Sequence, residues 1–179
     1  MNKRINLMFK PMKITNTFLT KTLIIFLISF ILFSCENNDD EIKTHDTNQA
    51  NIQTVNTMFT AFGKGDIDGM QKTVSDNTIW NYNGAPPIPY TGTYTGKAGV
   101  ADFVNTIFSS VEIISFKVNK IIAGDNNTVV VLGEETQKIK SNGKLLTQTW
   151  VQVYTVENGL ITRMEEYANT AVSAKLFQN

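Results

Sequence analysis

The chain of 179 residues contains one cysteine and one histidine, His45, so it is poor in the residue types that metal sites and histidine-based triads use. A single cysteine cannot form an internal disulfide. Net charge is zero over the whole chain. Residues 1–21 contain five basic residues and no acidic one, whereas from residue 35 onward acidic residues outnumber basic ones by five. Such a domain has no basic surface for phosphates. We expect no metal, no cofactor and no nucleic acid.

Long apolar runs are also scarce, and the one that occurs covers residues 23–33 (LIIFLISFILF). Its 11 residues fall short of the ~20 that cross a bilayer as a helix, and with the basic segment before it the run is typical of a secretory signal. The following Leu32-Phe33-Ser34-Cys35 resembles the lipobox of bacterial lipoproteins. The resemblance implies a signal peptide over 1–34, acylation of Cys35 and a lipid-anchored protein of the cell envelope, facing the periplasm or the exterior. The alternative is an uncleaved membrane anchor with an incidental cysteine.

Residues 35–48 are polar and acidic and have no apolar periodicity, which predicts a tether. The acidic stretch over 36–41 is either a sorting signal for the outer surface or a solvated spacer. The remaining chain, 49–179, has no linker-like interruption and no internal repeat, so we expect one domain there.

The first half of this domain has helical periodicity. Apolar residues at spacings of three and four predict an amphipathic helix that ends at Gly63-Lys64-Gly65; they are Ile52, Val55, Met58, Phe59 and Phe62. Asp66 is a plausible N-cap for a second, short helix. Residues 78–82 predict a short strand, and Val100 to Val111 predict a third helix. Three of the four prolines lie in 83–96, which is expected to be a structured loop and neither strand nor helix.

In the second half the hydrophobic period changes to two. Four β-rich segments are separated by turn residues, with Asn142-Gly143 and Asn158-Gly159 as the strongest hairpin signals; the segments are 113–123, 128–139, 145–156 and 160–168. Helices followed by an antiparallel meander predict the α+β class, with the N-terminal helices packed on a strongly curved antiparallel sheet. Such a sheet tends to enclose a conical cavity, where a function would reside.

Several strings have the same order and composition as those of a known family. They are FGKGDID at 62–68, SDNTIW at 75–80, PYTGTYTGKAGV at 89–100, VENGLITR at 156–163 and EYANT at 166–170. Together they resemble the SnoaL-like, ketosteroid-isomerase-related branch of the NTF2-like superfamily over essentially all of 50–175. The resemblance implies an NTF2-like cone, but the fold hosts isomerases, cyclases, hydrolases, dehydratases and proteins without a reaction.

The catalytic positions of ketosteroid isomerases are vacant in this chain. By resemblance, the aspartate base falls near Asn81 or Tyr82, the oxyanion-hole aspartate at Val151, and the tyrosine near Met58 or Phe59. None of these side chains can take over the role at its position. Steroid isomerisation is therefore disfavoured by chemistry.

One carboxyl group remains as a candidate acid or base. In SnoaL-like relatives the last strand usually ends Glu-Tyr-x-Asp-Thr, whereas here Asn169 replaces the aspartate and Glu166 is the acid that is left. Strand alternation puts Met164, Glu166 and Ala168 on one face, which the resemblance turns toward the cavity. Desolvation there would raise the proton affinity of Glu166 and suit it to acid–base catalysis. The alternative is a structural glutamate at the pocket rim.

Seven residues are candidates for ligand binding: Trp80, Tyr82, Tyr90, Phe103, Val151, Met164 and Asn169. The first three flank the proline loop and could stack on a flat ligand or simply pack in the core. The resemblance points Val151 inward, so that Trp150 and Tyr154 would lie on the outer face as part of a homodimer interface. Glu134-Glu135 is expected to belong to a solvated strand face.

Two functional hypotheses follow, and a third is less specific. The first is a lipid-anchored extracytoplasmic domain that binds a small apolar or aromatic molecule in its cavity. The second is a cofactor-free isomerase, cyclase or dehydratase that uses Glu166 as base, with Tyr82 or Asn169 polarising a carbonyl group. The third is a dimeric interaction domain whose cavity is filled by its own side chains.

Overall fold

The computed structural model describes residues 38–178, with side chains from Thr44 onward. The expected signal peptide over 1–34 and the expected lipidation site Cys35 lie outside these residues. Within the described range, none of the helices is both long and apolar enough to cross a membrane.

Three helices precede most of the sheet. Helix α2 (Asn38–Gly63) begins well before the predicted helix, so residues 38–48, expected to be a polar tether, are helical. Its side chains from Thr44 to Ala50 are almost all exposed, and an exposed helix has no need of an apolar stripe. Helix α3 (Ile67–Lys72) has Asp66 as its N-cap, as predicted, with the Asp66 carboxylate accepting a hydrogen bond from the Gly69 amide. Helix α4 (Gly96–Ser110) buries an apolar face made of Val100, Phe103, Val104 and Ile107.

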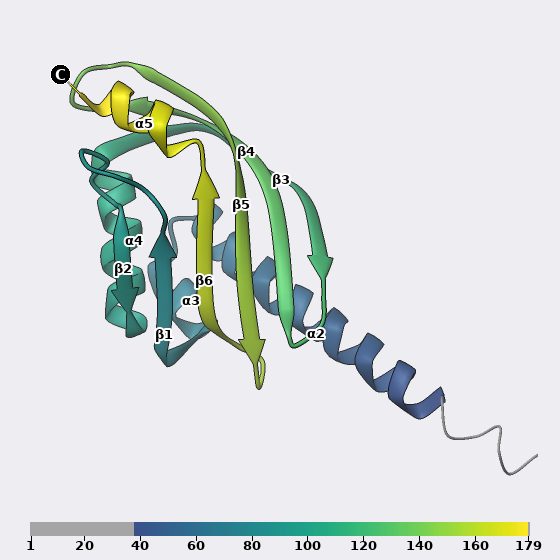
Figure 1. Ribbon diagram of the computed structural model, residues 1–179. Coiled ribbons are helices and arrows are strands. Elements are labelled where there is room, and N and C mark those ends of the chain that lie inside the picture. Colours follow the sequence, from purple (N-terminus) through teal and green to yellow (C-terminus); the bar gives the residue numbers. More distant parts are fainter. Residues whose placement is uncertain (1–37, 179) are drawn as a thin grey trace, which may run out of the picture. The chain divides into compact units, whose positions relative to one another are not determined.

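Six strands form one curved sheet in the order β2-β1-β6-β5-β4-β3 (Figure 1). Their bounds are β1 Val74–Tyr82, β2 Gly92–Thr95, β3 Val111–Ala123, β4 Thr128–Ile139, β5 Leu145–Glu157 and β6 Leu160–Ala168. Figure 1 shows the long strands β3, β4 and β5 bending over the helices. The α+β class and the curved sheet beneath N-terminal helices are confirmed, and the two Asn-Gly steps connect β4 to β5 and β5 to β6 as predicted.

Two details of the sheet differ from the prediction. Strand β2 lies inside the segment 83–96, which was expected to contain no strand, and it pairs with β1. The sheet is also not wholly antiparallel, because β1 and β6 run parallel. Strand β1 also begins earlier than the predicted strand over 78–82, at Val74, and its pairing with β6 has a register shift between Val74 and Ile79.

The inner face of the sheet holds large aromatic side chains that the curvature accommodates. Trp150 is buried and stacks on Phe116, with ring centroids 5.0 Å apart. Gly133 on the neighbouring strand leaves room for the indole, since a Cβ atom there would lie 2.0 Å from the Trp150 ring. This glycine is required by the close approach of a side chain rather than by its backbone angles.

A short C-terminal helix, α5 (Thr170–Phe177), was not predicted. Asn169 is its N-cap, and the Asn169 side chain accepts a hydrogen bond from the Val172 amide. The helix buries Ser173 and Phe177, and the Phe177 ring meets Tyr90 edge to face at 5.9 Å. Helix α5 therefore packs, through Phe177, against Tyr90 in the core between the sheet and the helices.

Candidate functional site

A cavity with about 40 Å³ of free space lies between the inner face of the sheet and the helices. Ligand pockets usually measure roughly 300–1,000 Å³, whereas one water needs ~10–15 Å³. The cavity as it stands therefore takes a few waters or a very small molecule, and a larger ligand requires side chains to move. Its lining residues are Met58, Phe59, Phe62, Met70, Trp80, Tyr82, Tyr90, Phe103, Val104, Ile107, Phe116, Glu135, Gln137, Gln152, Tyr154 and Glu166.

The apolar wall of this cavity is mainly aromatic. The rings of Tyr82 and Tyr90 meet edge to face with centroids 5.1 Å apart, and Trp80 meets Phe103 in the same way at 5.9 Å. Trp80 comes from β1 and Phe103 from α4, so sheet and helix layers both contribute. Such a wall favours flat or ring-shaped molecules over flexible polar ones.

The polar wall contains Glu166, which β6 directs into the interior. The residue is 7% exposed, and one of its carboxylate oxygens accepts a hydrogen bond of 2.8 Å from the Gln152 side-chain amide. Gln152 in turn accepts a hydrogen bond from the Tyr154 hydroxyl. Burial, with a smaller contribution from the charge of Glu135, raises the pKa of Glu166 to about 8. The carboxyl group is therefore largely protonated at neutral pH.

A second buried carboxyl group, Glu135 on β4, lines the same cavity. Glu135 is 7% exposed, so the expectation that it belongs to a solvated strand face is wrong. Strand alternation is the reason: its neighbour Glu134 is exposed and pairs with Lys117, which leaves Glu135 facing inward. Burial raises the pKa of Glu135, while hydrogen bonds from Gln148 and Gln137 act in the opposite direction.

Two buried donors that line the same cavity make no hydrogen bond within the part of the chain that the structure describes. They are the Trp80 indole N–H and the Tyr82 hydroxyl, which lies near Gln148 without reaching hydrogen-bonding geometry. Burial, and then the charge of Glu166, raises the pKa of Tyr82, so its hydroxyl keeps its proton. A buried donor without a partner costs free energy, and an acceptor atom of a ligand would relieve that cost.

Of the seven predicted ligand residues, four line the cavity: Trp80, Tyr82, Tyr90 and Phe103. Met164 is fully buried on β6 but is not among the lining residues. Asn169 does not reach the interior, because its side chain caps α5. Its assignment to the cavity is therefore wrong.

The inward orientation predicted for Val151 is also wrong. The β5–β6 register pairs Val151 with Tyr167 and Gln152 with Glu166, and paired residues point to the same side of a sheet. Tyr167 is 51% exposed, so Val151 faces outward. Trp150 and Tyr154 alternate with Val151 along the strand and are buried, so they face inward. Those two rings are buried and offer no outer surface to a second copy, so the expected homodimer interface cannot contain them.

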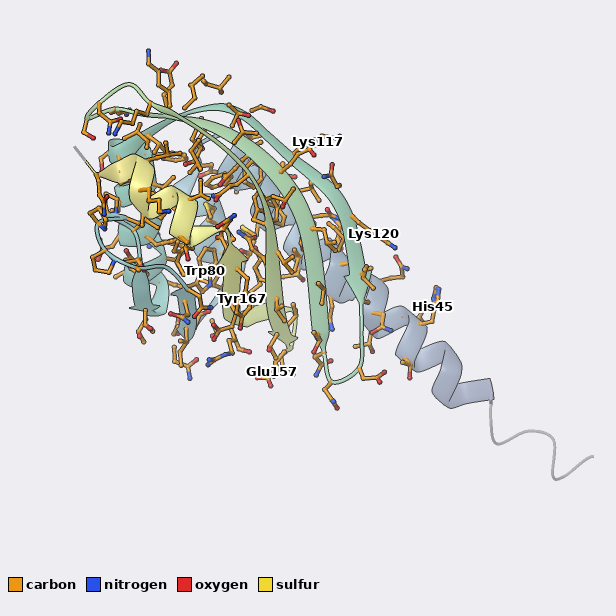
Figure 2. The ribbon with its side chains drawn as sticks, turned by 45° about the horizontal axis from the view of Figure 1, so that its top comes forward. His45, Trp80, Lys117, Lys120, Glu157 and Tyr167 are labelled. Carbon is orange, nitrogen blue, oxygen red and sulfur yellow. The ribbon has the colours of Figure 1, made fainter. Side chains whose placement is uncertain are left out.

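Val151 instead lines a shallow hollow on the outer face of the sheet. Leu132, Val151 and Tyr167 stand side by side on three neighbouring strands there, and Asn169 lies at the same hollow. Figure 2 labels Tyr167, and it shows Lys117 and Lys120 of β3 projecting outward. The hollow is open and separate from the residues that surround the acids.

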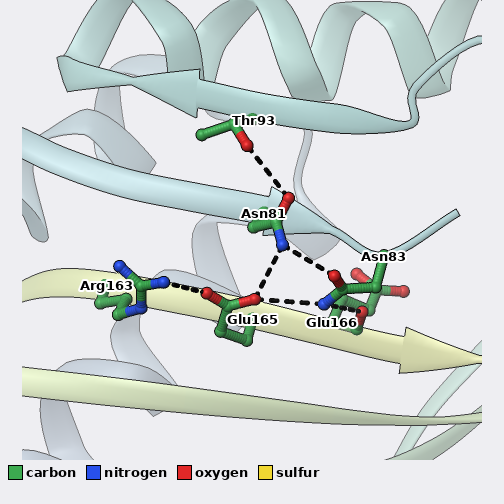
Figure 3. A network of polar contacts seen from close by, with 6 residues as sticks. All are labelled: Asn81, Asn83, Thr93, Arg163, Glu165 and Glu166. Atoms are coloured by element: carbon green, nitrogen blue, oxygen red, sulfur yellow. Dashed lines mark hydrogen bonds and ion pairs between the residues drawn. The ribbon is translucent and has the colours of Figure 1, made fainter.

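The outer face also carries Glu165, whose surroundings contrast with those of Glu166 (Figure 3). Its carboxylate accepts hydrogen bonds from the Asn81 and Asn83 amides at 2.9 and 3.1 Å and pairs with Arg163. Partial burial raises the pKa of Glu165, but these partners outweigh it and hold that pKa below its usual value. Asn81, one of the two residues near which the resemblance placed the isomerase base, thus belongs to a surface network.

Sequence reasoning missed Glu135 and its glutamine partners. Alternation along 128–139 could have signalled Glu135, because apolar Val129 and Val131 share its parity. Among residues 38–178, no group of three or more His, Cys, Asp and Glu side chains lies close enough to hold a metal ion. The polar groups that line the cavity are carboxyl, hydroxyl, amide and indole groups.

A comparison with protein families identifies the family of this domain. The model of the SnoaL-like domain matches residues 55–164. The chain belongs to the SnoaL-like domain family. The resemblance inferred from the sequence strings is thereby confirmed, and no curated protein sequence matches the chain.

Solved structures similar to this SnoaL-like domain share its architecture. An NTF2-like protein from Burkholderia xenovorans LB400 is 27% identical, with a TM-score of 0.65 over 72% of this chain and 96% of that one. An NTF2-like protein of unknown function from Burkholderia pseudomallei K96243 is 26% identical, with a TM-score of 0.64 over 73% and 98%. TerC, co-crystallised with polyporic acid, is 22% identical, with a TM-score of 0.63 over 73% and 99%, and this likeness shows the fold alone.

Proposed function

We propose that this SnoaL-like domain binds a small planar carbonyl compound in its cavity and moves a proton on it, as an isomerase or cyclase without a cofactor does. The observation that carries the proposal is Glu166, a carboxyl group enclosed in an aromatic cavity with a pKa of about 8. A group that titrates near neutral pH can both give and take a proton under physiological conditions. The co-crystal of TerC with polyporic acid supports a small-molecule role for the fold.

The reaction needs no further reactant. A proton leaves the carbon next to the carbonyl group and returns to another atom of the same molecule, so the molecule is neither oxidised nor reduced. Negative charge collects on the carbonyl oxygen, where the Trp80 N–H, the Tyr82 hydroxyl and a protonated Glu166 are candidate hydrogen-bond donors.

Glu166→Gln tests this proposal. The amide keeps the shape and accepts the Gln152 hydrogen bond but cannot exchange a proton, so turnover is expected to fall about 10²–10⁴-fold. Probes are acetylacetone, followed by deuterium exchange at carbon, and cyclic β,γ-unsaturated ketones, followed by conversion to the conjugated isomer.

The matched control is Glu165→Gln, one position along the same strand but in the surface network. It is expected to keep wild-type turnover. Equal rates for wild type and Glu166→Gln, or an equal loss in both variants, would contradict a catalytic Glu166.

Binding without chemistry is the second candidate, and the mainly apolar aromatic lining favours it. In that case the same ketones stabilise wild type and Glu166→Gln equally in thermal unfolding, and neither protein exchanges deuterium into them. Ketones that bind wild type and also exchange would exclude this alternative.

We also propose, from Leu32-Phe33-Ser34-Cys35, that acylation of Cys35 holds the domain at the cell envelope. Cells fed labelled palmitate are expected to incorporate label into the full-length protein, and Cys35→Ser is expected to abolish incorporation and release the protein from the membrane fraction. Unmodified Cys35 in the mass spectrum of the membrane-bound protein would overturn the anchoring.

A further inference from the structure

Three buried glutamines connect hydroxyl groups to the two acids of the cavity. The Tyr154 hydroxyl donates to Gln152, whose amide N–H donates to Glu166 at 2.8 Å. This connection runs across the inner face from β5 to β6. Within residues 38–178, Gln152 is the one side chain that donates an N–H to the Glu166 carboxyl group.

Glu135 receives two such connections. The Tyr90 hydroxyl donates to the Gln137 carbonyl oxygen at 3.3 Å, and the Gln137 N–H donates to one Glu135 oxygen at 2.7 Å. The Ser173 hydroxyl donates to the Gln148 carbonyl oxygen at 2.9 Å, and the Gln148 N–H donates to the other Glu135 oxygen at 2.7 Å. Both oxygens of Glu135 therefore accept a short hydrogen bond from an amide.

In the structure, the NH₂ end of each glutamine faces the acid and its carbonyl oxygen accepts a hydrogen bond from a hydroxyl group. A hydroxyl that donates to the carbonyl oxygen of a glutamine leaves its NH₂ group for the carboxylate, and N–H donors stabilise the ionised form of an acid. Glu135 thus has two groups that favour its charge, and Glu166 has one. Glu166 makes no hydrogen bond through its other oxygen among the described residues, and its carboxyl group faces the cavity.

Among the described residues, no lysine, arginine or histidine lines the cavity with these acids. The titratable side chains that line it, besides the two glutamates, are Tyr82 from β1, Tyr90 from the loop after it and Tyr154 from β5. The helices α2, α3 and α4 and strand β3 contribute only apolar side chains to the lining. Two carboxylates without a nearby cation repel each other, so one of them keeps a proton more readily than the other.

We propose that Glu135 is the ionised carboxylate of the cavity and Glu166 the protonated one, so that Glu135 acts as the base and Glu166 as the acid. This assignment of roles rests on the proposed function and changes it at one point, because Glu166 then donates rather than abstracts. The Glu135 carboxylate takes a proton from the carbon beside the carbonyl group, and the C–H electron pair moves into a C–C double bond while the Glu166 proton moves to the carbonyl oxygen, which gives the enol. Glu135 then delivers its proton to another carbon, and the enol O–H proton returns to Glu166 as the carbonyl group re-forms.

The protonation states can be measured without a ligand. In the folded protein labelled with side-chain carbon-13 glutamate, one buried carboxyl carbon is expected to titrate near pH 8 and to disappear in Glu166→Gln. A second buried signal is expected to titrate at lower pH and to disappear in Glu135→Gln. Glu134→Gln and Glu165→Gln, each one position away on the opposite face, are expected to leave both signals in place. The reverse assignment, with the higher titration lost in Glu135→Gln, would overturn the proposal.

A milder pair of variants covers the case in which Glu135→Gln does not fold. Gln148→Met removes one of the two N–H donors of Glu135 and is expected to move only the lower titration upward. Gln152→Met removes the one N–H donor of Glu166 and is expected to move only the upper titration upward. A shift of the other signal in either variant contradicts the proposed assignment.

Turnover supplies a separate test with the ketone probes. The rate of wild type is expected to rise with pH as Glu135 ionises and to fall near pH 8 as Glu166 loses its proton. Glu135→Gln is expected to lose the activity, and Glu166→Gln to lose the alkaline fall along with most of the rate. If the carbon-13 titrations agree but no ketone reacts, the proposed function fails and the protonation assignment stands. An alkaline fall that persists in Glu166→Gln would overturn the role of Glu166 as acid.

Discussion

Two pairs of adjacent glutamates show how position decides the chemistry of one residue type. Glu134 and Glu165 point outward, where Lys117 and Arg163 reach them, and both have lowered pKa values. Glu135 and Glu166 follow them by one residue, point inward and have raised pKa values because burial disfavours their charge. A step of one residue along a strand therefore replaces a surface ion-pair partner by a buried candidate acid or base.

The free energy of unfolding of the domain should depend on pH because the pKa of Glu166 is raised in the folded state. The folded protein holds this proton up to about pH 8, while the unfolded chain releases it near the ordinary value of 4.5. Between these limits the unfolded state binds fewer protons, so the free energy of unfolding falls as pH rises, by roughly 1 kcal/mol per pH unit. Below about pH 4.5 the folded and the unfolded protein both hold this proton, so Glu166 no longer makes the free energy of unfolding change with pH.

Urea unfolding at several pH values between about 5 and 9 measures this dependence. Glu166→Gln is expected to flatten the decline, leaving the part due to Glu135, and to be more stable than wild type above pH 8. Glu165→Gln serves as control and is expected to keep the wild-type decline. A Glu166→Gln protein with an unchanged decline would show that Glu166 is not the group responsible.

At the scale of elements, helix α5 links the end of the chain to the acid network. Ser173 on this helix donates to Gln148, which donates to Glu135, and Phe177 packs against Tyr90. The helix has only eight residues, so its first turn depends on the cap at Asn169.

Asn169→Ala is expected to lower the free energy of unfolding by about 1 kcal/mol, because the Val172 amide loses its side-chain acceptor. Asn169→Asp retains an acceptor and is expected to stay near wild type. Urea unfolding measures both variants, and thermal shift with the ketone probes measures binding. Loss of binding at unchanged stability would restore the ligand-binding role that the sequence predicted for Asn169.

The elements with a long, regular pattern were predictable, and the ones set by pairing between distant segments were not. The helical period before Gly63 and the alternation after residue 113 identified most helices and strands. An element that buries one face has apolar residues at the spacing of that face, so its type can be inferred from the sequence. Strand β2 has four residues within a proline-containing segment, and its existence depends on pairing with β1. The orientation of Val151 likewise depends on its register with Tyr167, which a single strand does not encode.

At the scale of the whole domain, the interior is mostly filled by the protein's own side chains. The free space of about 40 Å³ exceeds the volume of one methylene group but is well below that of an ordinary ligand pocket. Both buried acids, the Trp80 and Tyr82 donors and several aromatic rings line this space. A bound ligand and the domain's own side chains therefore compete for the same space.

Val104→Leu tests that competition, since Val104 is buried on α4 and lines the cavity. The added methylene has room and is expected to leave stability unchanged or raise it by up to about 1 kcal/mol. It should also weaken binding of the ketone probes by roughly tenfold or more. The control is Val131→Leu, at a fully buried position on β4 away from the cavity, where overpacking is expected to cost about 1–3 kcal/mol. Equal destabilisation by the two substitutions in urea unfolding would mean that the cavity is not available space, and the ligand would then have to bind elsewhere.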